Sequence, residues 1–386
     1  MKTALITLYA SKTSQKRHFD HHLRTSADNP LYQEVTESRE NAQEMAKLTD
    51  LVRNHYPLKG PISIRHLNQG VNDIFLIESG SKETKKKHIL RISDTNKHHY
   101  LKEPNQTSPC HFELELIEHI STELEKYPNI SLSQPVRTED DNLFIKYDTR
   151  SSKIVSIFTF VEGEIAPTTD PMTEYQNILF GQAIAAFHES AKTYQTDHSK
   201  REFSLDYLIK ESLDNIKSLP IGKKPTSDQL AIMENIAKKV TVQLDSIDKN
   251  RDKYWGYLHG DHNTVNHFFD PSTHPESIKI FDTDLCGRGP RVYDLAVPLW
   301  TPRFDRMPNN KHFLQVLEGY RSIHVLSEEE ENAIPSYVIA RHFSWMRSIS
   351  DPSFNPELNY RKFWQEAILF LQDLKITQHL TKIQTS

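Results

Sequence analysis

The sequence predicts an α+β fold in two parts, an antiparallel sheet with one helix followed by a mainly helical part. Three observations predict it. Short apolar runs with strand-like alternation, separated by turn residues, occupy residues 62–92 and 143–161. Beyond residue 174, apolar residues recur at helical spacing over long segments. The chain has 386 residues, of which 37% are apolar and 10% aromatic, and this is enough to build a real hydrophobic core.

The composition argues against several classes of protein. The net charge of −5 does not fit a general nucleic-acid-binding surface. Two cysteines, Cys110 and Cys286, imply no disulfide framework and fit a reducing compartment. No run approaches the roughly 18–20 apolar residues that span a bilayer. Residues 4–10 only faintly resemble a signal peptide, since the apolar part is short and lacks a cleavage site, so we expect a cytoplasmic protein without a membrane partner.

The first 45 residues are polar and rich in His, Ser, Thr and charge, and we interpret residues 1–45 as an N-terminal extension. A helix is predicted over 40–55, because Met45, Leu48 and Val52 fall on one helical face.

Strand signals begin at residue 62. The polar run 68–73 lies between two apolar runs and predicts a turn. A second group of strands completes an antiparallel sheet, and residues 162–164 then break the pattern. The predicted strands cover residues 62–67, 74–78, 88–92, 143–146 and 154–161.

Helical patterns follow. A helix is predicted to begin near Cys110, with Phe112, Leu116 and Ile120 directed inward. We interpret His188 as a hydrogen-bonded structural histidine. The acidic run 328–331 is expected at a helix start, where Ser327 with Glu330 forms a capping box. The later helices are predicted at residues 178–188, 226–248, 311–323, 327–349 and 356–380.

The chemistry concentrates in residues 259–284. Asp261 is followed five positions later by Asn266, and two more acids, Asp282 and Asp284, stand behind a short apolar run. Protein kinases use this order of groups: a catalytic-loop Asp, an Asn five residues on, and a metal-binding Asp beyond a strand pair. The spacing therefore predicts phosphoryl transfer from ATP to a hydroxyl.

The apolar runs 267–269 and 278–281 are separated by turn residues, so a hairpin would return Asp282 to the neighbourhood of Asn266. Amide and carboxylate oxygens are ligands that Mg²⁺ accepts. An alternative is a zinc site formed by the histidines of this segment. Neither Cys-x-x-Cys nor His-Glu-x-x-His accompanies them, which disfavours that alternative. These histidines are His259, His262 and His267.

The joint pattern is His-Gly-Asp-x4-Asn at 259–266, Asp-x-Asp at 282–284 and Asp-Leu-Ala at 294–296. It resembles the aminoglycoside phosphotransferase and choline kinase superfamily, nearest to the branch of stress-response kinase A and homoserine-kinase-type enzymes. The resemblance implies a protein-kinase-like bilobal fold, with an antiparallel-sheet N-lobe at 46–161 and a mainly helical C-lobe at 162–386. It covers about residues 50–350.

By this resemblance Asp261 is the catalytic base, and Asn266 and Asp282 are the magnesium ligands. Asp284 would be a second acid of the metal or substrate site. Asp294 would lie at a helix start and brace the catalytic loop.

The resemblance also implies groups that hold the nucleotide. The predicted turn at Gly70 and Asn72 would cover the phosphates. Arg91 stands where many kinases have a lysine that contacts the α and β phosphates, and arginine can serve there through its planar fork. Its expected ion-pair partner is Glu113, with Glu115 as the alternative.

The hinge between the lobes would fall at 160–163, and the backbone at Phe160 and Val161 would bind adenine. We expect an enzyme that uses ATP and Mg²⁺ and takes a small-molecule hydroxyl as acceptor. A protein Ser/Thr acceptor is the second hypothesis, and a nucleotide-binding scaffold with little turnover is the third. The sequence contains no Ala-Pro-Glu activation segment after Asp284, and this favours a small molecule.

Overall fold

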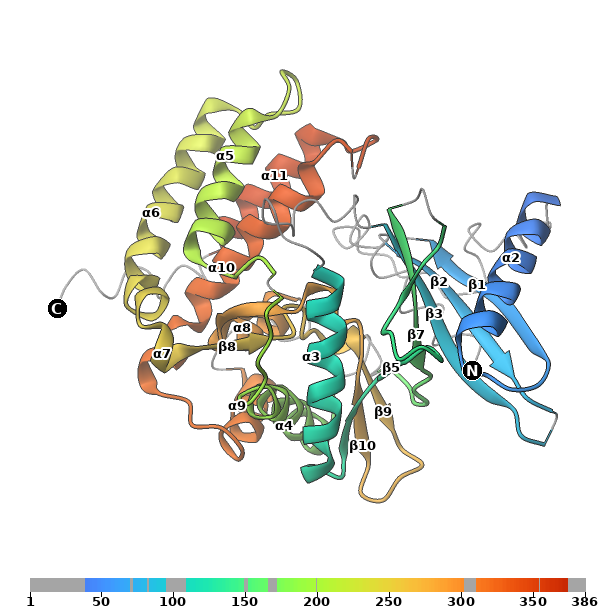
Figure 1. Ribbon diagram of the computed structural model, residues 1–386. Helices are drawn as coiled ribbons and strands as arrows, with labels where there is room; N and C mark the ends of the chain where they lie inside the picture. Colours follow the sequence, from blue (N-terminus) through green and yellow to red (C-terminus); the bar gives the residue numbers. More distant parts are fainter. Residues whose placement is uncertain are drawn as a thin grey trace. The chain divides into compact units, whose positions relative to one another are not determined.

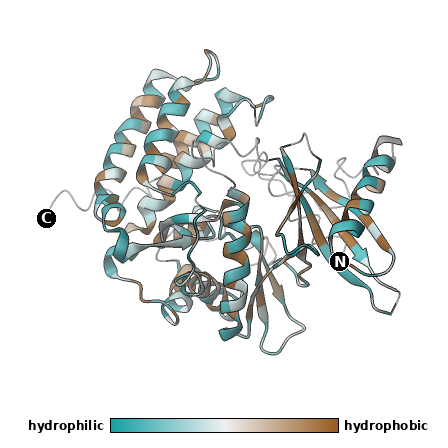
Figure 2. Ribbon diagram, in the orientation of Figure 1, coloured by the Kyte–Doolittle hydropathy of each residue, from teal (hydrophilic) through white to brown (hydrophobic). Residues whose placement is uncertain are grey.

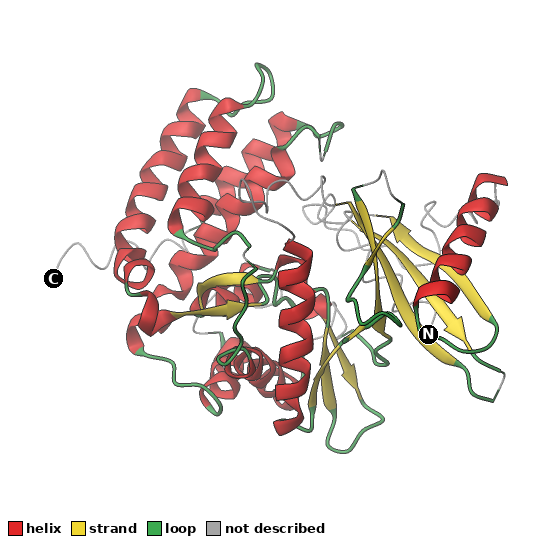
Figure 3. Ribbon diagram, viewed as in Figure 1, coloured by secondary structure: helices red, strands yellow, loops and turns green. Residues whose placement is uncertain are grey.

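The computed structural model describes residues 39–69, 72–81, 83–94, 109–148, 152–165, 172–198, 200–301, 310–353 and 355–373. The chain divides into two compact units. Strands dominate the described part of the first unit and helices that of the second (Figure 3). The units are Met1–His99 with Leu132–Ile165, and Tyr100–Ser131 with Ala166–Ser386. The lobe boundaries predicted at 46–161 and 162–386 stay predictions.

The first unit is an antiparallel sheet whose order is β1-β2-β3-β7-β5, with β6 also paired to β7 (Figure 1). β2 and β3 are almost completely buried along their centres because apolar residues run through them. The strands are β1 (Ile62–Gln69), β2 (Asn72–Ser79), β3 (Lys86–Asp94), β5 (Pro135–Val136), β6 (Ile145–Lys146) and β7 (Lys153–Thr159).

Helix α2 (Arg39–His55) packs against this sheet, and the predicted helix at 40–55 is confirmed. Leu48 and Val52 are completely buried in a core with strand residues such as Ile77 and Leu90. Each such side chain contributes about 1.5–3 kcal/mol through burial. The Tyr56 hydroxyl also donates to the backbone oxygen of Val155 at 3.0 Å, which ties the end of the helix segment to β7.

The predicted turn at 68–73 is too long. β1 continues to Gln69 and β2 begins at Asn72, because Asn68 pairs with Ile74 after a register shift in β1. A strand bulge of this kind keeps polar residues in the ladder although their composition suggests a turn. Gly70 lies outside the described residues.

Two other strands are shorter than predicted. The run 143–146 pairs only as β6, and the strand predicted to end at Val161 ends at Thr159. Thr159 is held by the 133–134 segment, since its backbone N–H donates to Gln134 and its oxygen accepts from Ser133. Phe160 and Val161 therefore follow the strand.

The second unit is mainly helical. Alternation of apolar and polar residues along α5 and α6 (Figure 2) marks helices that are buried on one side. Capping boxes at Thr173, Thr226 and Ser327 satisfy backbone N–H groups at three helix starts, and the predicted box at Ser327 is confirmed. The helices are α3 (Pro109–Glu123), α4 (Glu174–Ser190), α5 (Glu211–Ser218), α6 (Ser227–Lys249), α7 (Arg251–Tyr254), α8 (Val292–Trp300), α9 (Lys311–Arg321), α10 (Glu328–Ser350) and α11 (Tyr360–Leu371).

The last predicted helix, at 356–380, is wrong at its start. α11 begins at Tyr360 because the Asn359 side chain accepts the backbone N–H of Lys362 and caps the helix there. The helix ends at Leu371, and residues beyond 373 lie outside the described part of the chain.

Two small sheets carry the segment of chemical interest, and β9–β10 and β8–β11 are antiparallel pairs in them. One has the order β4-β10-β9 and the other pairs β11 with β8. In the described residues, no helix is both long and apolar enough for a membrane span. The strands are β4 (Ile130–Leu132), β8 (Trp255–Leu258), β9 (His267–Asp270), β10 (Ser277–Ile280) and β11 (Gly287–Pro290).

Candidate active site

Asp294, in the first turn of α8, holds the backbone of the segment that follows β8. Its carboxylate accepts the backbone N–H groups of His259 and Gly260, both at 2.9 Å. His188 on α4 completes the support, because its Nε2 lies 3.0 Å from Asp294 Oδ2 and its Nδ1 lies 3.0 Å from the Tyr320 hydroxyl. Asp294 is completely buried. The predicted brace is present, and His188 has the structural role expected of it.

Gly260 is required by its surroundings. Its φ is +77°, a left-handed conformation that side chains disfavour. A Cβ at this position would lie 2.4 Å from the backbone oxygen of Leu285 and 2.7 Å from the Phe203 ring. The close approach lets the loop turn sharply before Asp261.

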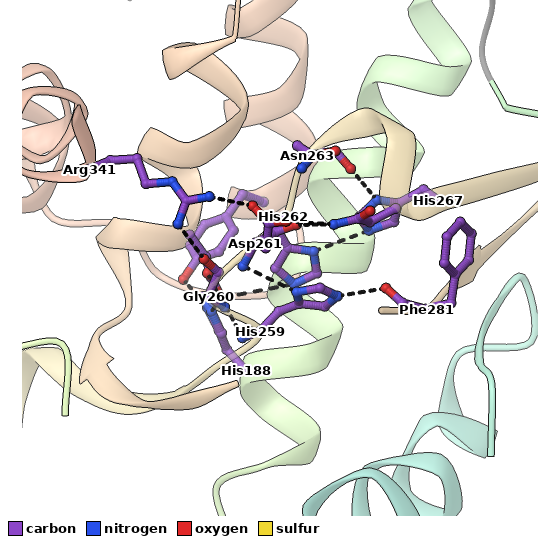
Figure 4. A network of polar contacts seen from close by, with 12 residues as sticks. His188, His259, Gly260, Asp261, His262, Asn263, His267, Phe281 and Arg341 are labelled. Atoms are coloured by element: carbon purple, nitrogen blue, oxygen red, sulfur yellow. Dashed lines mark hydrogen bonds and ion pairs between the residues drawn. The ribbon is translucent and has the colours of Figure 1, made fainter. Parts of the chain in front are cut away.

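Asp261 is 5% exposed, and other groups hold both of its carboxylate oxygens. Oδ2 accepts Asn266 Nδ2 at 2.9 Å, and the same amide also reaches the backbone oxygen of Asp261 at 2.9 Å. Oδ1 accepts Arg341 Nη2 at 2.6 Å (Figure 4). Asn266 commits its amide nitrogen to Asp261, so its carbonyl oxygen is the atom that can ligate a metal.

Arg341 comes from the middle of α10 and was not predicted as a site residue. Its Nη1 also lies 3.3 Å from the Tyr293 hydroxyl and 3.4 Å from the Gly260 oxygen. Burial works to lower the pKa of Arg341, but Tyr293 and Asp261 raise it above its ordinary value, so the guanidinium stays cationic. The available signal was an arginine directly after the apolar run 337–340.

The histidines of the loop serve the backbone and each other. His259 Nε2 donates to the Phe281 oxygen at 3.0 Å, and its Nδ1 accepts the Asp261 N–H at 3.3 Å. His262 Nδ1 lies 3.1 Å from His267 Nε2 (Figure 4). Burial, reinforced by the neighbouring rings, lowers the pKa of His262 well below its usual value and that of His267 to about 3. Within the described residues, the group of three histidine and acidic side chains that could share one ion lies outside this loop. This does not favour the zinc alternative here.

The predicted hairpin is present. β9 pairs with β10 so that Ile280 faces His267, and the Phe281 N–H donates to the backbone oxygen of Asn266 at 3.2 Å. Asp282 follows directly with φ 65° and ψ 54°, a left-handed conformation that costs energy in most residues and that Asp tolerates. The hairpin thus returns Asp282 to the neighbourhood of Asn266.

Helix α3 contacts the turn that follows Asp282. Glu113 is 4% exposed and accepts the Thr283 hydroxyl at 3.2 Å. Glu115, the alternative partner for Arg91, instead lies 3.3 Å from His198. This places Glu113, and not Glu115, beside the candidate metal site.

Lys200 is a second buried cation that was not predicted. Its Nζ donates to the backbone oxygen of Asp284 at 2.6 Å. Burial works to lower the pKa of Lys200, but Cys286 and Glu113 help to raise it above its ordinary value. Asp284 itself is 8% exposed. Nothing in the local sequence marks Lys200, because it lies next to Arg201 in a polar segment.

The candidates in the first unit are Arg91, Asn72, Phe160 and Val161. Arg91 lies in the middle of β3, 6% exposed, with its guanidinium 4.8 Å from the centre of the Phe158 ring. Asn72, also 6% exposed, begins β2. Phe160 lies under Lys87 Nζ at 4.9 Å, and Val161 is half-buried. Since Arg91 and Glu113 belong to different units, their ion pair stays a prediction.

Residues 72–326 match the model of the phosphotransferase enzyme family, APH. This match spans more than half of the chain, and the chain therefore belongs to that family. It is 27% identical over 288 residues to an uncharacterized protein of Synechocystis sp., covering 74% of this chain and 73% of the relative. It is 24% identical over 344 residues to an uncharacterized protein of Deinococcus radiodurans, covering 83% and 89%.

Solved structures share the fold. A microcompartment-associated aminopropanol kinase superposes with a TM-score of 0.61 at 19% identity, covering 86% of this chain and 96% of its own. The amicoumacin kinase hAmiN, in complex with AMP-PNP and Ca²⁺, gives 0.62 at 17% identity, covering 89% and 97%. Choline kinase from Cryptosporidium parvum gives 0.60 at 13% identity, covering 86% and 97%. The predicted protein-kinase-like α+β fold is confirmed, and the finer branch stays a prediction.

Proposed function

We propose that this phosphotransferase uses ATP and Mg²⁺ and moves the γ-phosphoryl group to a hydroxyl of a small molecule. The observation that carries the proposal is the buried hydrogen bond of 2.9 Å between Asp261 and Asn266. The β9–β10 hairpin brings Asp282 back to the neighbourhood of this pair. A carboxylate, an amide oxygen and a second carboxylate in this order are the groups that phosphoryl transfer needs.

The donor set fits Mg²⁺. The Asn266 carbonyl and the Asp282 carboxylate are hard oxygen ligands, and Mg²⁺ keeps several waters, so two protein ligands are sufficient. Asp284 is the candidate for a third. Bound Mg²⁺·ATP would supply the phosphoryl group and neutralise the charge on its oxygens.

The residues of the chain would position the acceptor. Asp261 would accept or orient the proton of the attacking hydroxyl, which requires a fixed carboxylate. Arg341 and Asn266 each hold one of its oxygens, and each oxygen retains a lone pair for the hydroxyl. Asp294 keeps the loop backbone in place. Most of the rate enhancement would come from this positioning and from electrostatic stabilisation.

A small acceptor is favoured over a protein. In protein kinases, the segment after the metal-binding acid is long and docks the peptide. Here β11 follows the turn at Asp284 directly and α8 begins at Val292. The segment between Asp284 and α8 is therefore too short to dock a peptide in the same way. The solved relatives named for small-molecule acceptors, such as the aminopropanol kinase, support the same choice.

The test is Mg²⁺-dependent conversion of ATP to ADP by the full chain, with Asp261→Asn as the matched variant. We expect turnover to rise with a suitable acceptor and to fall by at least about 10²-fold in Asp261→Asn. Equal turnover of both proteins across a broad acceptor panel would refute the enzyme and leave the scaffold hypothesis.

The acceptor panel separates the two enzymatic hypotheses. It should contain homoserine, choline, amino sugars and aminoglycosides beside a casein-type protein. Label transfer from γ-labelled ATP to a small molecule supports the proposal. Transfer to the protein substrate alone would support the protein kinase hypothesis instead.

A further inference from the structure

Two histidines and a glutamate gather on the second unit outside the candidate active site. They are His111 and Glu115 on α3, and His198 on the segment that follows α4. One donor atom from each lies within 4.8 Å of the other two, and all three side chains are half-buried. Donor atoms that share one zinc ion lie roughly 3–3.5 Å apart, so small side-chain rotations would close the set.

Helix geometry and the following segment create the cluster. His111 and Glu115 are four residues apart, and such residues lie on one face of a helix. The His198 ring stacks on the His111 ring at a centroid distance of 4.8 Å and an interplanar angle of 10°. His198 Nε2 also lies 3.3 Å from Glu115 Oε1.

Outer groups orient the glutamate. Its Oε2 accepts the Thr196 hydroxyl at 3.1 Å and the Tyr194 hydroxyl at 3.3 Å. The Thr196 oxygen also accepts the backbone N–H of His198 at 3.0 Å, which fixes the segment that presents the imidazole. The carboxylate therefore turns Oε1 toward the histidines, and hydrogen-bonded outer partners of this kind are typical of metal ligands.

The charges suit a cation. Burial lowers the pKa of His111, the neighbouring His198 lowers it further, and Glu115 opposes both. His111 is thus held in the neutral form that binds metals. A simple His198–Glu115 ion pair would account for one imidazole, but it gives no reason for a second ring stacked on the first.

We propose that His111, Glu115 and His198 bind a divalent transition metal ion of the zinc class. Two imidazole nitrogens and one carboxylate oxygen are a common zinc set, with water in the fourth position. The proposal does not depend on the phosphotransferase reaction.

The ion would link two elements that reach the candidate active site. α3 carries Glu113, which accepts the Thr283 hydroxyl, and the segment of His198 continues to Lys200, which donates to Asp284. Metal at this position would therefore fasten both elements beside the turn that begins at Asp282. Its expected role is to stabilise that arrangement.

The test uses the full chain, stripped with a chelator and kept in millimolar Mg²⁺ so that sites preferring Mg²⁺ are filled. Co²⁺ is titrated by its visible absorption, and Zn²⁺ then displaces it. We expect one ion per chain to bind with the absorption of a site containing nitrogen ligands. Binding should weaken at least about 10-fold in Thr196→Val and be lost in His111→Ala and His198→Ala.

His119→Ala is the matched control, because His119 lies on the same helix, contacts Thr193 and the Tyr194 ring, and contributes no donor atom to the set. Zn²⁺ should raise the melting temperature of wild type and of this control, and not that of His111→Ala. If a histidine variant fails to fold, Glu115→Gln is measured in its place, and it should also lose Co²⁺ binding and the Zn²⁺-dependent rise in melting temperature. Unchanged Co²⁺ binding in the folded ligand variants, or no site-specific binding in wild type, would overturn the proposal.

Discussion

At the scale of single residues, the site is a carboxylate held between a cation and an amide. Arg341 reaches three groups at once: Asp261, Tyr293 and the Gly260 oxygen. A planar guanidinium can do this, whereas an ammonium is a single compact charge. Replacement of Arg341 by lysine should therefore hold the Asp261 carboxylate less firmly while keeping a positive charge beside it.

We expect Arg341→Lys to lower kcat about 10- to 100-fold, which corresponds to about 1.4–2.7 kcal/mol of transition-state stabilisation. The control is Arg347→Lys, a second buried arginine of α10 that donates to the Tyr207 oxygen. Both variants should lose a similar amount of thermal stability. If their kcat values fall equally, Arg341 has only a structural role.

Asp294 is the other residue whose contacts make a sharp prediction. Asp294→Asn would turn an amide group toward the N–H of either His259 or Gly260, leaving a buried donor facing a donor. We expect a loss of about 2–4 kcal/mol in the free energy of unfolding, measured by urea denaturation. Asp245→Asn, which disturbs only an exposed pair with Lys249, should change it by less than about 0.5 kcal/mol. Equal losses in the two variants would mean that Asp294 does not brace the loop.

At the scale of elements, the β9–β10 hairpin carries both proposed metal ligands and has its own ion pair. Lys279 Nζ lies 2.7 Å from Asp270 Oδ2, and the side chains are 19% and 13% exposed. The hydrogen bonds from Lys279 and then Ser272 lower the pKa of Asp270 from 3.8 to about 2. Because the folded pKa lies below the unfolded one, the stabilisation is complete above about pH 4 and is lost as the pH falls toward 2.

Lys279→Met should accordingly lower the free energy of unfolding by about 1–2 kcal/mol at pH 7, after allowance for solvent screening. The difference from wild type should shrink at pH 3. There the unfolded chain binds a proton at Asp270 that folded wild type does not, so wild type loses a stabilisation that the variant lacks. Urea denaturation at pH 7, 5 and 3 measures it. A difference that stays constant with pH would show that lost packing, and not the ion pair, is responsible. Lys249→Met removes an exposed pair and serves as the reference.

Helices α4 and α9 meet through glycines. A Cβ on Gly181 would lie 1.9 Å from the Val316 oxygen, and one on Gly319 would lie 2.0 Å from the Ile178 oxygen. Both contacts are with backbone, so neither can yield by a side-chain rotation. α4 also carries His188, so its position matters for Asp294.

Gly319→Ala should destabilise the protein by about 1–3 kcal/mol, although alanine favours a helix by about 1 kcal/mol. Gln182→Ala, a half-buried position on the facing helix, should stay within about 0.5 kcal/mol. Melting temperatures and urea midpoints measure both. A neutral or stabilising Gly319→Ala would contradict the close backbone packing.

At the scale of the whole molecule, the structure confirms the predicted features that neighbouring residues form. The Ser327–Glu330 capping box spans three positions and the β9–β10 hairpin spans fewer than twenty, and both are found as predicted. Local hydrogen bonding and alternation decide such features whatever the rest of the chain does. Asp294 was predictable because its motif fixes its distance from the loop.

Contacts between distant segments were not predictable. Arg341 meets Asp261 across 80 positions, and Lys200 meets Asp284 across 84. Each is a cation buried by tertiary packing. The sequence around Lys200 resembles that of any exposed cation, and the apolar residues before Arg341 indicate burial but not the partner. The bulged β1 and the capped start of α11 were missed for a different reason. Their contacts are local, but strand pairing and a side-chain cap override composition there.

Binding of Mg²⁺·ATP should raise the stability of the whole molecule, and we expect Asp282 to contribute to this effect as a metal ligand. Ligand binding at 100 times the dissociation constant adds about 2.7 kcal/mol to the free energy of unfolding, so Mg²⁺·ATP should raise the melting temperature of wild type by a few degrees more than ATP alone. Asp282→Asn keeps the size of the side chain and tolerates the same φ, so it should fold and lose the Mg²⁺-dependent part of the shift.

Asp141, with φ 62°, is the matched control, because it is an exposed aspartate with a similar positive φ. Asp141→Asn should show the full Mg²⁺-dependent shift. If Asp282→Asn showed it as well, Asp282 would not be a metal ligand. If Mg²⁺ added nothing to the shift of the wild-type chain, the proposed metal dependence would be wrong while the family and fold would stand.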